Sequence, residues 1–151
     1  MSQFRYRPNI AAIVQRHDEK ILIGERLDVP GAWQFPQGGV KKSETAEQAL
    51  ARELKEEISL EPGAYRVIDS NGPYRYLFAK GRTKEGYSGQ EQTYFLAELL
   101  GPETNIDPAT EEPEFSTVRW IDPAEFQLTW VPEFKQEVYR QVFLDFFQHY
   151  L

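Results

Sequence analysis

Three neighbouring glutamates, Glu53, Glu56 and Glu57, are the residues whose type and spacing point most directly to chemistry. They lie in residues 45–58, which have the apolar periodicity of a helix at about 100° per residue. Glu53 and Glu57 fall inside the apolar arc of that helix and Glu56 lies at its edge, although charges usually occupy the solvated face. Carboxylates this close repel one another and resist desolvation, so we expect a cation among them. Hard divalent ions prefer oxygen ligands, and magnesium usually joins carboxylates to substrate phosphates.

The alternative is an ordinary acidic helix whose charges are solvated and paired at i,i+4 spacing. Arg52 stands one turn before Glu56 and can fix the rotamer of that side chain. The loop before the helix favours the ligand site, because Gly38 and Gly39 permit either a close backbone approach to a ligand or a positive φ. A plain acidic scaffold does not explain these glycines.

The whole run resembles the box of the Nudix hydrolases, in which Gly, five residues, Glu and seven residues precede Arg-Glu-apolar-any-Glu-Glu-any-Gly-apolar. Gly38, Glu44 and residues 52–57 match it, and Ser59 stands where the family has the second glycine. That glycine would end the helix in a left-handed cap. A serine adopts this conformation at a cost of about 1 kcal/mol, so the departure concerns local stability more than chemistry.

Further segments resemble one branch of that family, which acts on the 5′ ends of RNA and on diadenosine polyphosphates. They are residues 7–9, 33–39, 89–92, 113–115 and 134–135, so the resemblance covers nearly the whole chain. It implies an α+β fold, an α/β/α sandwich with a mixed central sheet, formed by a single domain over residues 1–151. It also implies attack of water on phosphorus, with departure of a phosphate or nucleotide.

The resemblance also assigns site residues. It implies that Glu53, Glu56 and Glu57 bind Mg²⁺, for which Mn²⁺ can substitute, with help from the Gly38 carbonyl. Glu114 would come from a distant loop to complete the site. The general base stays open among Glu53, Glu57 and Glu114, and so does the number of metal ions.

The substrate is expected to meet cations and an aromatic ring. By position in the family, Arg7, Arg26 and Lys135 would bind phosphates and Phe134 would stack on a base, which tolerates any base. Tyr76 and Gln92 are further candidates. The arginines can equally be ordinary surface residues, and Phe134 also fits the apolar stripe of the last helix.

The elements that must position these residues follow from periodicity and turn signals. Strands are predicted at 10–14, 20–24, 65–69, 74–79, 93–99 and 117–121, and helices at 45–58 and 132–149. Thr45 and Gln48 have the spacing of a capping box. Residues 29–42, 80–90 and 101–114 are predicted to be loops because they are rich in Gly, Pro or charge. This order favours an α+β or layered fold with a mixed sheet.

Composition narrows the function further. The 151 residues contain no cysteine, which excludes disulfides, zinc–thiolate sites and a thiol nucleophile. No signal segment or membrane span is visible, so we expect a cytoplasmic protein without membrane partners, as a monomer or weak homodimer. A net charge of −7 argues against a broadly basic surface and against DNA as a partner.

Two substrates remain open for a metal-dependent pyrophosphohydrolase: a dinucleoside polyphosphate such as diadenosine tetraphosphate, or the 5′-triphosphate end of RNA. The acidic balance favours the small nucleotide slightly, since it gives little nonspecific attraction to RNA. The alternative from another class is a catalytically weak Nudix-like module that binds nucleotides or regulates a partner. Ser59 is its only support, because no catalytic glutamate is lost.

Overall fold

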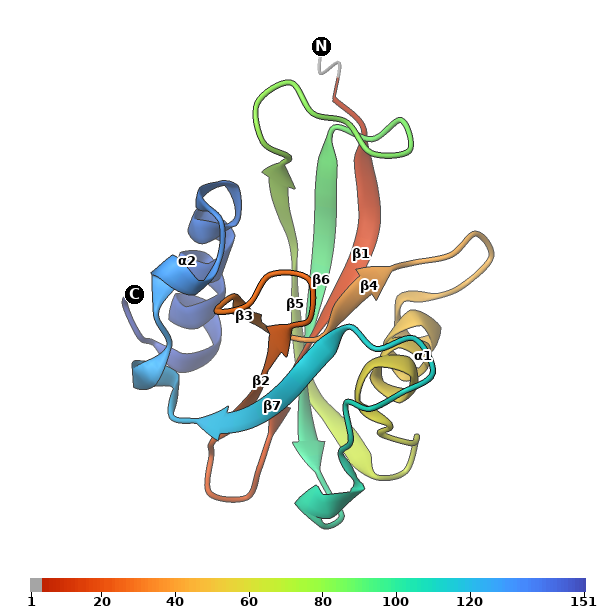
Figure 1. Cartoon of the computed structure of the whole chain (residues 1–151), viewed down its shortest axis with the longest axis vertical. Helices are drawn as coiled ribbons and strands as arrows, with labels where there is room; N and C mark the ends of the chain where they lie inside the picture. Colours follow the sequence, from red (N-terminus) through yellow and green to blue (C-terminus); the bar gives the residue numbers. More distant parts are fainter. Residues whose placement is uncertain (1–3) are drawn as a thin grey trace.

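The computed structural model describes residues 4–151 and contains a mixed sheet between two helices (Figure 1). The strands are β1 (Tyr6–Gln15), β2 (Ile21–Arg26), β3 (Trp33–Gln34), β4 (Gln37–Gly39), β5 (Tyr65–Leu77), β6 (Gly89–Leu99) and β7 (Phe115–Ile121). The helices are α1 (Ala46–Ile58) and α2 (Glu133–Phe147), with short 3₁₀ helices η1 (Glu103–Asn105), η2 (Pro123–Glu125) and η3 (Leu128–Trp130). The predicted α+β fold with a mixed sheet is confirmed.

The sheet is built around β1. Its main path runs β3-β2-β1-β6-β5, while β4 pairs with β1 and β7 pairs with β2. β1 and β6 are parallel along their length, and the other pairs are antiparallel. Because β4 and β6 flank the same part of β1, the glycines of β4 lie close to the strands that carry the polar side chains of the site.

The side chains of β1 alternate between two cores, as the pleat of a strand requires. Ile10, Ala12 and Val14 pack into a cluster with the apolar face of α1. Ala11 and Ile13 pack into an aromatic-rich cluster with α2 on the opposite face. Figure 1 shows α1 and α2 on the two sides of the sheet, which confirms the predicted α/β/α layers. No helix within residues 4–151 is long and apolar enough to cross a membrane.

The structure corrects the boundaries of several elements. The predicted loop 29–42 contains β3 and β4, which are short and obtain their partners from β2 and β1. The two strands predicted at 65–69 and 74–79 are one strand, β5, whose pairing with β6 shifts register between Val67 and Asp69 and between Asn71 and Tyr74. Gly72 at the second shift has a φ of 144° and lies against the Gln92 carbonyl, where a Cβ would collide.

The sequence pattern also misplaced the start of β6 and the end of the last helix. β5 ends at Leu77 and β6 begins at Gly89, so the connection between them lies at residues 78–88, two residues earlier than the predicted loop at 80–90. The last helix ends at Phe147, and Gln148 closes it in the left-handed conformation with a φ of 53°. The glutamine cannot be distinguished from a helical residue by periodicity, and this explains the overestimate.

Candidate active site

Helix α1 begins and ends with well-defined caps that fix the direction of its carboxylates. The Thr45 hydroxyl accepts from the Gln48 backbone N–H at 3.1 Å, and the Gln48 side chain accepts from the Thr45 N–H at 2.9 Å. The predicted capping box is confirmed. At the other end Ser59 takes the left-handed conformation, with φ 62° and ψ 19°, and its hydroxyl donates to the Asp107 carbonyl at 2.8 Å. The serine therefore replaces the glycine without changing the cap.

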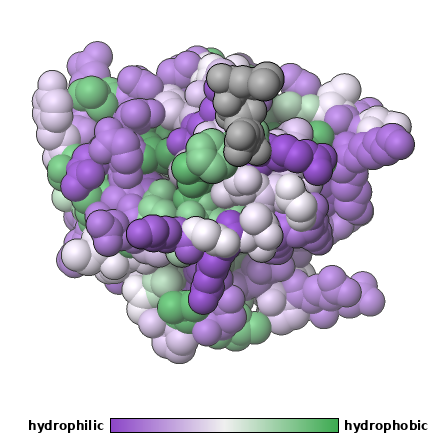
Figure 2. Space-filling model, turned by 90° about the horizontal axis from the view of Figure 1, so that it is seen from above, coloured by the Kyte–Doolittle hydropathy of each residue, from purple (hydrophilic) through white to green (hydrophobic). Residues whose placement is uncertain are grey.

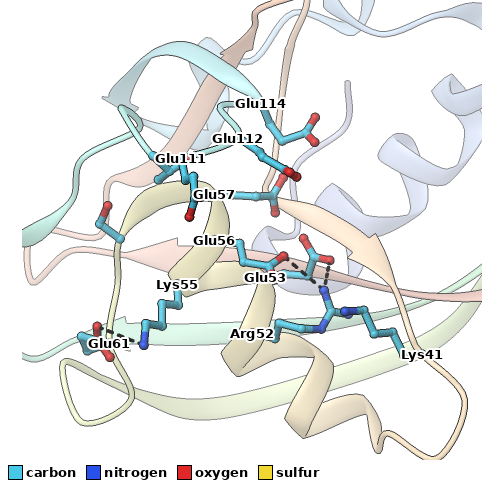
Figure 3. Close-up of a pocket in the computed structure, with 12 residues that line it drawn as sticks. Lys41, Arg52, Glu53, Lys55, Glu56, Glu57, Glu61, Glu111, Glu112 and Glu114 are labelled. Carbon is cyan, nitrogen blue, oxygen red and sulfur yellow. Dashed lines mark hydrogen bonds and ion pairs between the residues drawn. The ribbon is translucent and has the colours of Figure 1, made fainter.

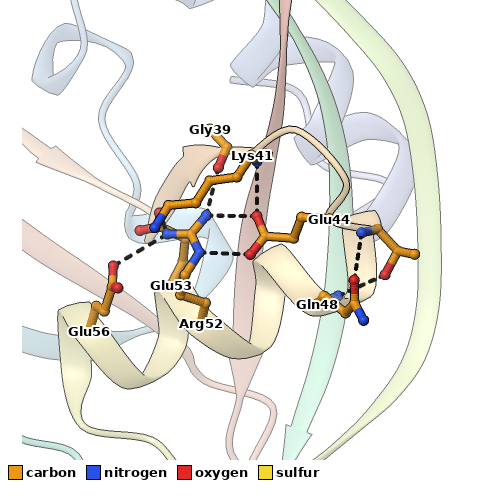
Figure 4. A network of polar contacts seen from close by, with 8 residues as sticks. Gly39, Lys41, Glu44, Gln48, Arg52, Glu53 and Glu56 are labelled. Atoms are coloured by element: carbon orange, nitrogen blue, oxygen red, sulfur yellow. Dashed lines mark hydrogen bonds and ion pairs between the residues drawn. The ribbon is translucent and has the colours of Figure 1, made fainter.

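Arg52 is the centre of a polar network that ties α1 to the loop before it (Figure 4). Its guanidinium donates to both carboxylate oxygens of Glu44, at 2.8 and 2.9 Å, and to the Gly39 carbonyl at 2.8 Å. It also donates to Glu53 at 2.6 Å and more weakly to Glu56 at 3.3 Å. The paired guanidinium lowers the pKa of Glu44 to about 2. Glu44 and Arg52 thus join β4 to the acidic helix.

Glu57 is the most unusual carboxylate of the site. Only 3% of its surface is exposed, and its Oε2 is buried without a hydrogen-bond partner. Burial raises the pKa of Glu57 well above its ordinary value, and the charges of Glu53 and Glu114 add to the increase, against a backbone hydrogen bond from Gln37. Burial likewise raises the pKa of Glu53. A buried acceptor without a donor is costly unless a cation satisfies it.

These carboxylates face a groove of about 870 Å³ between α1 and the segment before β7 (Figure 3). Glu53, Glu56 and Glu57 line one side, and Glu111, Glu112 and Glu114 line the other. The backbone carbonyl of Glu114 accepts from the Leu27 N–H at 2.9 Å, which places its segment beside β2. The structure therefore brings Glu114 to the predicted metal ligands across more than fifty residues of sequence.

The donor set fits a hard divalent cation. Every candidate side chain offers carboxylate oxygens. A bound cation would satisfy the buried Glu57 Oε2, which has no hydrogen-bond partner. Within residues 4–151, no three His, Cys, Asp or Glu side chains converge closely enough to form a ligand cluster as they stand. Glu53 and Glu56 are instead turned to Arg52.

The two glycines of β4 each leave room for one charged side chain. A Cβ on Gly38 would collide with the Glu53 carboxylate, and a Cβ on Gly39 would collide with the Arg7 guanidinium. Neither glycine has a positive φ. Of the two roles expected for this pair, close approach is therefore the one that the structure requires, and it involves the protein's own side chains.

A second group of predicted residues lies on the α2 side of the sheet. The Tyr76 ring is 5.8 Å from the Phe134 ring, and the Lys135 ammonium lies 5.9 Å from the first ring and 6.0 Å from the second. Burial raises the pKa of Tyr76 to about 12, against the charges of Arg7 and Arg26. Burial also lowers the pKa of Lys135 to about 8, assisted by Arg26. Tyr76, Phe134 and Lys135 therefore form one cluster, and Arg26 lies close enough for its charge to act on Tyr76 and Lys135.

Gln92 has a supporting position rather than an open one. Only 1% of its surface is exposed, and its amide NH₂ donates to Asn9 at 2.9 Å and to Gln37 at 2.7 Å. Asn9 in turn donates to Gln90 at 2.7 Å, and Gln90 donates to the Tyr76 hydroxyl. Both N–H groups of Gln92 are used, so none is left for a substrate. In this geometry Gln92 therefore has no free N–H group with which to donate a hydrogen bond to a substrate.

This chain of amides was missed by the sequence analysis, which singled out only Gln92 and Tyr76. It connects Tyr76 on the α2 side to Gln37, whose backbone N–H donates to Glu57. Asn9, Gln37 and Gln90 all fall within the segments that carried the resemblance. The sequence could have indicated this chain of amides, because polar side chains occupy positions of β1 and β6 that alternate with core residues.

Comparison with known proteins gives one family. The family model described as NUDIX domain matches residues 5–142. An RNA pyrophosphohydrolase from a Nitratiruptor species is 42% identical, over 98% of this chain and 97% of that protein. An RNA pyrophosphohydrolase from Hydrogenovibrio crunogenus is 39% identical, over 95% of this chain and 90% of that protein.

Solved structures agree in fold. The E. coli dihydroneopterin triphosphate pyrophosphohydrolase matches with a TM-score of 0.73 at 23% identity, over 94% of this chain and 97% of that one. A C. elegans Ap4A hydrolase binary complex matches with a TM-score of 0.58 at 18% identity, over 78% and 81% of the two chains. At these identities the structural likeness supports the layered fold alone.

Proposed function

The chain belongs to the Nudix family, and from that premise we propose that it is a divalent-metal-dependent hydrolase that removes pyrophosphate or phosphate from the 5′-triphosphate end of RNA. The observation that carries the metal dependence is the buried Glu57 oxygen without a partner, in a groove lined by further carboxylates. The relatives at 39–42% identity that are named RNA pyrophosphohydrolases support the RNA substrate.

Glu53, Glu56 and Glu57 would hold Mg²⁺, or Mn²⁺ in its place, together with the Gly38 carbonyl. When bound, such an ion offsets the charge of the phosphates and lowers the pKa of a coordinated water. Arg52 holds Glu53 and Glu56 at the groove, and the Gln37 N–H holds Glu57. The proton of the attacking water goes to Glu53, Glu57 or Glu114, and single Gln variants of the three would identify the base.

The remaining predicted residues would bind the rest of the substrate. Arg7, Arg26 and Lys135 offer positive charge at the α2 end, where phosphate oxygens need donors. Phe134, which is partly buried and tilted by 43° to Tyr76, offers a ring on which a base can stack. Tyr76 would support that ring, since it is itself buried with its hydroxyl bonded to Gln90.

A dinucleoside polyphosphate is the second candidate substrate. The net charge of −7 favours a small anion over a long one, because a compact substrate needs fewer positive contacts. The catalytically weak module stays the alternative outside enzymes. A location in the cytoplasm, the absence of DNA and membrane partners, the single domain over 1–151 and a monomer or weak homodimer all stay predictions.

One assay tests the proposal. The protein is incubated with a 5′-triphosphorylated RNA, diadenosine tetraphosphate or a nucleoside triphosphate, in the presence of Mg²⁺, Mn²⁺ or a chelator. We expect metal-dependent release of phosphate or pyrophosphate from the RNA, and none with the chelator. Hydrolysis of diadenosine tetraphosphate alone would establish the second candidate. If the protein binds nucleotide but hydrolyses none of these substrates, it is the catalytically weak Nudix-like module.

A further inference from the structure

Residues 78–89, which form the connection from β5 to β6 together with the first residue of β6, concentrate positive charge on a chain that is acidic overall. It carries Lys80, Arg82 and Lys84 against Glu85 alone, whereas the net charge of the protein is −7. In the part of the chain from residue 4 onward, none of these three cations takes part in an ion pair. Their charges are therefore available to an external anion.

This basic hairpin is anchored rather than free. The backbone N–H groups of Ser88 and Gly89 donate to the Arg5 carbonyl at 2.7 and 3.3 Å. Lys84 and Tyr87 exchange two backbone hydrogen bonds of 2.9 Å, which close the turn. The Arg5 guanidinium lies 5.0 Å from the centre of the Tyr87 ring. The cations thus stand on an ordered turn that is fixed to the start of β1, as Figure 1 shows at the end of the molecule where the chain begins.

Aromatic side chains connect this hairpin to Tyr76 and to Phe134, the ring on which a base is proposed to stack. Phe78, at its root, lies 6.2 Å from the Tyr76 ring, which is in turn 5.8 Å from Phe134. Lys84 is also near enough to Lys135 for its charge to contribute, after burial and Arg26, to the lowered pKa of that lysine. Figure 2, which looks onto this end, shows hydrophilic side chains around a central group of apolar ones.

We propose that the basic hairpin, residues 78–89, binds the sugar–phosphate backbone of an RNA strand whose 5′ triphosphate lies in the acidic groove. This inference rests on the proposed function, and it gives a structural feature that would distinguish RNA from a dinucleoside polyphosphate as the substrate. Cations that follow the backbone, together with aromatic rings on which bases stack, are the combination that binds single-stranded nucleic acid. A dinucleoside polyphosphate ends at its second nucleoside, so it has no downstream phosphates for the hairpin to contact.

The test replaces Lys80, Arg82 and Lys84 together by Gln. The matched control replaces Lys20, Arg66 and Arg140 by Gln, which removes the same charge from sites outside the hairpin and the proposed site. Each phosphate contact with a single strand contributes about −0.7 to the slope of log affinity against log salt. Three contacts give about −2, so a fourfold increase in salt should weaken the wild-type RNA complex about twentyfold more than that of the hairpin variant.

Two readouts are needed. The first is the Michaelis constant for a 5′-triphosphorylated RNA of about 12 nucleotides, within the site sizes of single-strand binders, measured beside that for diadenosine tetraphosphate. The second is binding of the same labelled RNA to Glu57→Gln protein, with and without the hairpin substitutions. We expect the hairpin variant to raise the Michaelis constant for RNA about tenfold or more at low salt, and to weaken RNA binding equally. The constant for diadenosine tetraphosphate should change less than about twofold.

The proposal is overturned if the hairpin and control variants affect RNA equally, or if both substrates weaken together in the hairpin variant. It is also overturned if wild-type protein hydrolyses diadenosine tetraphosphate but neither hydrolyses nor binds the RNA, an outcome that leaves the metal-dependent hydrolase standing. If no substrate is hydrolysed, the proposed function fails. The binding measurement then still decides whether the hairpin contacts RNA.

Discussion

Adding a single methyl group at Gly38 should disable the site without unfolding the protein. The Cβ of Gly38→Ala would overlap all three atoms of the Glu53 carboxylate. Carbon contacts are favourable near 3.5–4.0 Å, so the carboxylate must withdraw by more than about 1 Å. Glu53 can do so by rotating, since its end is flexible, but it then leaves Arg52, to which it is bonded at 2.6 Å. A displacement of about 1 Å at a site of this kind costs roughly 100-fold in rate.

The effect on stability should be much smaller. The overlap involves a side chain rather than backbone, and overpacking of this kind costs about 1–3 kcal/mol. Replacing the glycine also stabilises the fold by about 0.4–1 kcal/mol, because alanine lowers the conformational entropy of the unfolded chain. Alanine can adopt the backbone conformation of Gly38, which has no positive φ. The net cost of about 1–2 kcal/mol corresponds to a decrease in Tm of roughly 2–8 °C for a chain of this size.

Gly39→Ala is the matched comparison, because its Cβ would meet Arg7 instead of Glu53. We expect a higher KM with kcat preserved, because a phosphate contact is displaced and the metal ligands are not. Gly101→Ala is the control, since its nearest neighbour would be the Asn105 amide at 3.2 Å. Steady-state kinetics with Mg²⁺ and thermal unfolding of the three variants measure these outcomes.

Two results would refute this reasoning. One is a Gly38→Ala protein that keeps kcat within about threefold of wild type, against the roughly 100-fold loss that a 1 Å displacement predicts. The other is a double variant, Gly38→Ala with Glu53→Ala, whose rate falls well below that of Glu53→Ala alone. Once the colliding carboxylate is absent, the methyl group should have little further effect, so the two substitutions should not be additive.

The buried groups give three further predictions. Glu57→Gln should decrease metal-dependent turnover by orders of magnitude and leave Tm in chelator equal or higher, because burial and Glu53 already disfavour the charged form; unchanged activity would disprove the metal assignment. Lys135 has a pKa lowered to about 8 by burial, Arg26 and Lys84, so its charge is present below pH 8 and lost above it; KM should increase from pH 7 to 9, and Lys135→Arg should flatten that limb of the profile. Phe134→Ala should raise KM about tenfold, since stacking contributes about 1–3 kcal/mol per base, and an unaltered KM would remove Phe134 from the site.

Helix α1 could be predicted almost to the residue because its signals are local. Thr45 and Gln48 mark its start, its apolar residues repeat with the helical period, and Ser59 closes it at the predicted position. The burial of Glu57 also followed from the sequence alone, because the position of a side chain on a helix is set by its angle. The partnership of Arg52 with Glu44 and the Gly39 carbonyl could not be predicted this way, since it crosses from the helix to β4.

The elements that depend on distant partners were harder. β3 and β4 are short and rich in polar residues or glycine, and only their pairing with β2 and β1 makes them strands. The merging of two predicted strands into β5 required the ladder of β6 to continue past two register shifts. The proximity of Glu114 to Glu57 came from the family resemblance, because no local pattern relates residues so far apart in sequence.

The short strand β4 explains why residues 37–39 carry such a specific sequence. Their side chains alternate across the sheet, so Gln37 and Gly39 face the α2 side and Gly38 faces α1. Gln37 accepts from Gln92 through its side chain and donates to Glu57 through its backbone. Gly38 admits the carboxylate of Glu53, while Gly39 admits Arg7 and offers its carbonyl to Arg52. The proposed metal ligands and phosphate contacts therefore lie on opposite faces and meet at this strand. Any side chain larger than hydrogen at either glycine must displace a charged group of one face or the other.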